Sequence, residues 1–293
     1  MRGPGGAGAG GKDWRAALLL VLMLCPDVAA SQTFSRAVVQ QRAARVDELF
    51  NWYYAAAYGT GVYKIGEETV GVLRAPFAYR IREAGEGQWG IRLTLPVSAA
   101  LTEFDLTDFQ LGHVRAAGLS VLPGIEAEIP LAERWVLKPF ANVGPGWEFK
   151  RDGTAVIYSA GAATVYQLPL DHGRRSSLGA KLTFAGYDAG SEGSRLAALA
   201  GGGNFEFPID MQIGGQPALL GVQLIGTVYF NRIEFLFPDS ADKKVFAEVE
   251  FAVTLGVRKP VEFFSMSIDR VGIGIHRGSN GLKGVQLVGS FPF

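Results

Sequence analysis

Hydrophobic and polar residues alternate one by one along most of the chain after residue 57. In the clearest run, one face is apolar and carries Val245, Ala247, Val249, Phe251, Val253 and Leu255. The other face carries Phe246, Glu248, Glu250, Ala252 and Thr254. A period of two residues is that of a β-strand, whose successive side chains point to opposite faces of the sheet. The pattern therefore predicts an all-β fold.

The alternation divides into about twelve predicted strands. They cover 57–67, 69–83, 88–103, 113–130, 134–150, 154–169, 176–188, 194–211, 217–235, 243–259, 263–277 and 282–293. Ten or fourteen strands remain open. The apolar faces carry few charges, which favours a transmembrane antiparallel β-barrel with its apolar faces toward lipid over a soluble sandwich with its apolar faces inward.

Connections sort onto two sides of such a barrel. One side has the predicted connections 130–134, 208–215 and 259–261. The other takes the more polar segments 105–112, 188–194, 238–244 and 278–281, which we assign to the outside.

The first 56 residues have a different character. Arg2, Lys12 and Arg15 precede an apolar run at 16–25 and the small residues 28–30, so we expect residues 1–30 to be a secretory signal peptide. Apolar residues in 31–56 recur at helical spacing, which predicts a short N-terminal helix in or under the pore, a periplasmic surface helix, or an early first strand. Residues 57–293 then form the outer-membrane barrel, and export places it in the outer membrane of a Gram-negative bacterium.

The last predicted strand ends on an aromatic residue. Its alternating face carries Val285, Leu287, Gly289, Phe291 and Phe293. We expect Phe291 and Phe293 to be the signal through which the strand meets the barrel-assembly machinery.

If the apolar faces meet lipid, the polar faces line the lumen. The predicted lumen charges are Arg74, Arg80, Arg82, Arg92, Glu126, Glu128, Lys138, Glu148, Lys181, Glu206, Asp210, Glu248 and Glu250. Both signs occur, so the charges either pair and brace the wall or form a selective constriction. Aromatic residues near strand ends predict interfacial girdles at Trp52, Tyr79, Trp89, Trp135, Trp147, Phe149 and Tyr229.

Signals for other functions are weak. Charges balance at 28 against 28, which gives no reason to expect nucleic acid as a partner, and the expected partner is outer-membrane lipid. The three histidines, His113, His172 and His276, have no metal-site spacing. We therefore expect no catalytic, metal or cofactor residues, and a structural, channel or small-scale transport role. Two alternatives stay open: a barrel enzyme that hydrolyses lipids or peptides, and a soluble periplasmic β-sandwich or barrel that binds a ligand.

Segments 122–130, 138–144 and 284–293 resemble the solitary outer-membrane autotransporter-like β-barrel family, and the likeness extends over about residues 35–293. The resemblance implies a fold like the translocator domain of autotransporters, with a helix inside a twelve-stranded barrel. It implies no catalytic or ligand residues. Only a short segment separates the expected cleavage site from the barrel, so we expect no passenger.

Overall fold

The computed structural model describes residues 59–65, 68–85, 87–102, 115–149, 153–171, 173–190, 192–234, 244–263 and 266–293. All of them belong to one compact unit, Arg45–Phe293. The predicted signal peptide, 1–30, and the predicted helical segment, 31–56, lie outside the described residues.

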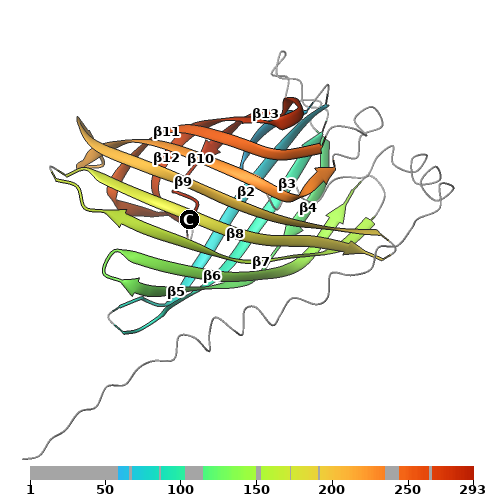
Figure 1. Cartoon of the computed structure of the whole chain (residues 1–293), viewed down its shortest axis with the longest axis horizontal. Helices are drawn as coiled ribbons and strands as arrows, with labels where there is room; N and C mark the ends of the chain where they lie inside the picture. Colours follow the sequence, from blue (N-terminus) through green and yellow to red (C-terminus); the bar gives the residue numbers. More distant parts are fainter. Residues whose placement is uncertain are drawn as a thin grey trace, which may run out of the picture. The chain divides into compact units, whose positions relative to one another are not determined.

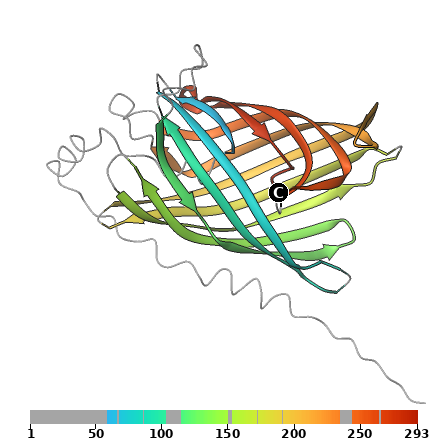
Figure 2. The ribbon, with the colours of Figure 1, turned by 180° about the vertical axis from the view of Figure 1, so that it is seen from behind.

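The described chain is almost entirely strand. Its strands are β1 (Gly61–Ile65), β2 (Glu68–Arg82), β3 (Gly90–Thr102), β4 (Arg115–Val121), β5 (Gly124–Ala132), β6 (Trp135–Glu148), β7 (Gly153–Leu168), β8 (Arg175–Ala189), β9 (Glu192–Ile213), β10 (Gln216–Glu234), β11 (Lys244–Phe263), β12 (Met266–Gly278) and β13 (Lys283–Val288). All pairings are antiparallel and join sequence neighbours, except that β4 and β5 each pair with β3 and β6, and β1 joins β13 to β2 and closes the ring (Figures 1 and 2).

Strands β4 and β5 together form one interrupted strand of the barrel wall. Both lie between β3 and β6, and they are separated by Leu122 and Pro123. Backbone hydrogen bonds continue across this break, because Leu122 N–H donates to Pro96 and Val143 N–H donates to Pro123. The ring therefore has twelve strands, and the predicted antiparallel barrel is confirmed.

Turns at one rim are tighter than the predicted connections. Strand β9 runs to Ile213 and turns through Gly214 and Gly215, whose φ angles are 57° and 77°. Two consecutive residues with positive φ fit a type I′ hairpin, which glycine adopts without strain. Strand β11 likewise continues to Phe263, so 259–261 is strand and its prediction as a connection is wrong. We call this end the short-turn rim and the end with the connections 103–114 and 235–243 the long-loop rim.

The two faces of the wall have opposite character. Mid-strand apolar side chains such as Leu224, Phe251 and Ile273 are exposed on the outside, while Glu248, Glu250 and Thr254 are buried inside. The prediction for residues 245 and 246 is wrong, because Val245 is fully buried and Phe246 is 52% exposed. The pairing of β11 with β10 shifts register at this rim, which reverses the faces there.

The last strand is shorter than predicted. Strand β13 ends at Val288, opposite Gly272, and residues 289–293 are not strand. Phe291 and Phe293 therefore do not lie on its outward face. The end of the described chain is visible within the ring of strands in both whole-barrel views (Figures 1 and 2).

A glycine makes a cross-strand bond possible inside the barrel. Gly124 on β5 lies between Thr94 on β3 and Asn142 on β6. The Thr94 hydroxyl donates to Asn142 Oδ1 over 2.7 Å, and Asn142 donates to Ser159 over 3.3 Å. A Cβ at Gly124 would lie 2.0 Å from Asn142 Oδ1, so any larger residue displaces this hydrogen-bond ladder.

We expect Gly124→Ala to reduce the free energy of unfolding by about 1–3 kcal/mol, the range for overpacking a tight site. Urea unfolding followed by tryptophan fluorescence measures the loss. Gly201→Ala on β9 is the matched control, since its nearest atom would be 3.8 Å away. Equal stability of the two variants would contradict the role given to Gly124.

Candidate functional site

The lumen is the candidate site, because the polar side chains gather there. Ten predicted lumen charges are buried or half-buried: Arg74, Arg92, Glu126, Glu128, Lys138, Glu148, Lys181, Glu206, Glu248 and Glu250. The other three, Arg80, Arg82 and Asp210, are exposed near strand ends at the short-turn rim. The alternation along each strand predicts that these three side chains point inward. They are nevertheless exposed to solvent, because they lie close to the ends of their strands.

An acidic cluster surrounds His276 on the β10–β13 side. Glu248 and Glu250 project from β11, and their carboxylates lie 3.9 Å and 3.5 Å from the two ring nitrogens of His276. The Tyr229 hydroxyl donates to Glu248 over 2.8 Å. Tyr63 on β1 packs edge-on against the His276 ring, with the ring centroids 5.6 Å apart.

The Tyr63 hydroxyl also donates to Gln286 Oε1 on β13, over 2.9 Å. The cluster therefore joins strands β1, β10, β11, β12 and β13 and bridges the seam where the barrel closes.

A second cluster centres on Arg270 of β12. Its guanidinium pairs with Glu206 of β9 and with Asp269, the latter at 2.8 Å. Glu206 also accepts a hydrogen bond from Asn204 over 2.6 Å. Because Arg270 and Glu206 come from strands that are not adjacent in the ring, this pair spans part of the lumen. A buried pair of this kind restricts how far the two wall segments can separate.

The opposite wall carries a basic region. Arg92 on β3 pairs with Glu126 on β5, which leaves Lys138 on β6 and Lys181 on β8. Within the described residues, neither lysine has an Asp or Glu carboxylate within ion-pair distance. The Lys181 ammonium lies 4.9 Å from the ring centroid of Phe140, and it interacts electrostatically with Arg74, Glu126 and Lys138.

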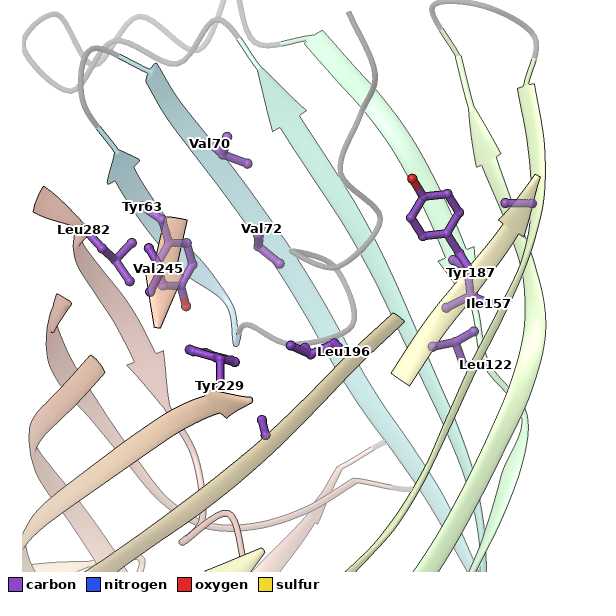
Figure 3. Close-up of a cluster of buried hydrophobic side chains, with 12 residues drawn as sticks. Tyr63, Val70, Val72, Leu122, Ile157, Tyr187, Leu196, Tyr229, Val245 and Leu282 are labelled. Carbon is purple, nitrogen blue, oxygen red and sulfur yellow. The ribbon is translucent and has the colours of Figure 1, made fainter. Parts of the chain in front are cut away.

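An apolar cluster also lies inside the barrel toward the long-loop rim. Tyr63, Val72, Ile157, Leu196 and Leu282 belong to one buried cluster whose side chains point into the barrel (Figure 3). The alternation predicted polar residues along the whole inner face, but part of that face is apolar. Tyr229 is part of this cluster and is 6% exposed, so its prediction as an interfacial girdle residue is wrong.

Residues 289–293 lie in the lumen. Phe293 is 6% exposed and packs with Ala163 of β7 and Ile225 of β10, with Phe291 and Ala200 beside it. The two phenyl rings meet edge to face, with centroids 4.9 Å apart. Lys138 Nζ donates to the main-chain oxygen of Phe293 over 3.1 Å. Since β13 lies across the ring from β7 and β8, the segment crosses the lumen.

Sequence reasoning missed His276 and Arg270 as lumen residues. Both lie on the β12 face shared with Gly272 and Gly274, opposite the apolar Val271, Ile273 and Ile275. This alternation is the signal that would have placed them inside.

Among the described residues, no group of three or more histidine, cysteine, aspartate or glutamate side chains is arranged to hold a metal ion. No helix within the described ranges is long and apolar enough to cross a membrane.

The fold and its lumen define a class, the closed twelve-stranded antiparallel β-barrel with an apolar outer surface and a charged interior. A scan against protein-family models and a search of curated proteins gave no match for the chain.

We expect Glu206→Gln to lower the free energy of unfolding by about 1.5–3 kcal/mol, the range for a hydrogen bond to a charged group. Arg80→Gln, which breaks an exposed pair with Glu83, is the control and should cost about 0–1 kcal/mol. Urea titration of both variants measures the difference. A loss at Glu206 no larger than that at Arg80 would show that the Arg270 pair contributes little.

Proposed function

We propose that the protein is an integral outer-membrane β-barrel that carries small solutes through its lumen, without catalysis. The exposed belt of aliphatic side chains between two sets of exposed aromatic residues carries the membrane assignment. A closed barrel with such a surface is compatible with the outer membrane of a Gram-negative bacterium.

The aromatic residues gather near both rims. At the short-turn rim the exposed ones are Tyr79, Trp89, Trp135 and Tyr166, and at the long-loop rim they are Trp147, Phe149, Phe230 and Phe246. Between them the exposed surface is mainly Leu, Val and Ile, such as Leu224, Val253 and Ile273. Amphipathic rings favour the headgroup region, and aliphatic chains favour the hydrocarbon. The short-turn rim then faces the periplasm, as is usual for outer-membrane barrels.

The charged interior supports a solute pathway. Charges in a lumen that holds water act on a passing solute, whereas a dry core would bury them at high cost. A translocator-like role, as in autotransporter barrels, is a narrower form of the same proposal and rests on the sequence resemblance alone. The hydrolytic alternative has no specific observation in its favour.

Reconstitution of the detergent-refolded protein in planar lipid bilayers tests the proposal. We expect discrete conductance steps, because solute and ions share the lumen. Slower gel migration after boiling confirms that the reconstituted protein was folded. A folded protein that shows no conductance, either unsubstituted or with residues 289–293 displaced from the lumen by substitution, would overturn the transport role.

We also expect Leu224→Arg, at a mid-strand position 55% exposed, to destabilise the barrel in lipid vesicles by about 2–4 kcal/mol. The charge would lie in hydrocarbon. Leu131→Arg, exposed beside a short turn, is the control and should cost about 0–1 kcal/mol. Urea unfolding from vesicles measures both values. Equal effects at the two positions would contradict the membrane assignment.

A further inference from the structure

The segment 289–293 occupies a seat that is shaped for an aromatic ring. Gly179 on β8 faces inward, and a Cβ built there would lie 2.5 Å from Phe293 Cγ and Cδ2. The neighbouring inward residues, Ala163 and Ala200, are also small. Glycine and alanine at these positions leave room for one phenyl ring against the wall.

The same seat offers a cation to an oxygen acceptor. Lys138 donates to the Phe293 oxygen, and Lys181 lies close enough to interact with Lys138 electrostatically. A solute carboxylate has two oxygen atoms and a full negative charge, so it can accept hydrogen bonds from both ammonium groups.

Resting on the transport role proposed above, we propose that this seat is a solute-binding site for small aromatic carboxylates. Residues 289–293 are its resident occupant and narrow the lumen while they are seated. The ring of the solute takes the place of Phe293 over Gly179, and its carboxylate binds Lys138 and Lys181. The resting state and the solute-bound state then differ in which aromatic ring, that of Phe293 or that of the solute, lies over Gly179.

The first part of the test opens the lumen in two independent ways. Phe291→Ser with Phe293→Ser removes the rings, and Gly179→Val fills the seat while leaving the segment intact. Both variants should show single-channel conductance several-fold above that of the unsubstituted protein. Gly201→Val on the neighbouring strand is the control, since its side chain points away from the lumen and the nearest atom to its Cβ would be 3.8 Å away. Unchanged conductance in both variants would overturn the proposal that residues 289–293 obstruct the lumen.

The second part tests the ligand class on the full chain carrying the two serine substitutions. Phenylacetate should reduce the conductance in a concentration-dependent manner, whereas acetate, which lacks the ring, should not. Adding Lys138→Gln should weaken the phenylacetate block several-fold. Equal effects of phenylacetate and acetate, or a block insensitive to Lys138, would overturn the aromatic carboxylate site.

The two proposals fail differently. If the unsubstituted protein already conducts as well as the opened variants, the transport role stands and the proposal that residues 289–293 obstruct the lumen is wrong. If every folded variant stays silent, the transport role itself is wrong.

Discussion

Backbone hydrogen bonding around a closed ring is the constraint on which the rest of this structure depends. Each strand pairs on both sides, and even the interrupted β4–β5 position keeps its bonds through Leu122 and Pro123. With the backbone satisfied within the wall, side chains alone decide what each face contacts. The outer face can then be wholly apolar and the inner face polar, which suits a membrane where no water is available to the backbone.

Alternation predicted this wall well because a strand has only two faces. Phe251 and Glu250 are adjacent in sequence and lie on opposite sides of the barrel, and the period of two gives that directly. The faces of Val245 and Phe246 were predicted wrongly, because a register shift between β11 and β10 reverses which side chains of β11 point inward. Such a shift depends on the partner strand and not on the local sequence. The lumen pairs were harder still. Arg270 on β12 pairs with Glu206 on β9, and no local sequence pattern predicts a pairing between two strands that are not adjacent in the ring.

The lumen is organised in depth as well as by charge. An apolar cluster containing Tyr63 and Val245 lies toward the long-loop rim, beside the acidic cluster around His276. The ion pairs of Arg270 lie nearer the short-turn rim, and Phe293 packs against small residues of β7, β8 and β9. The period-two pattern ran on through Phe291 and Phe293, so periodicity alone assigned them to the strand. The chain leaves the wall after Val288, and no local pattern marks that point.

The position of β1 has a consequence for biogenesis. Gly61 pairs with Gln286 and Lys64 with Lys283, so the first and last strands of the wall come from opposite ends of the described sequence. A nascent chain that has not yet delivered residue 283 is an open sheet with two unsatisfied borders, which are templates for pairing with other chains. The wall therefore loses its last free edges only when β13 pairs with both β12 and β1.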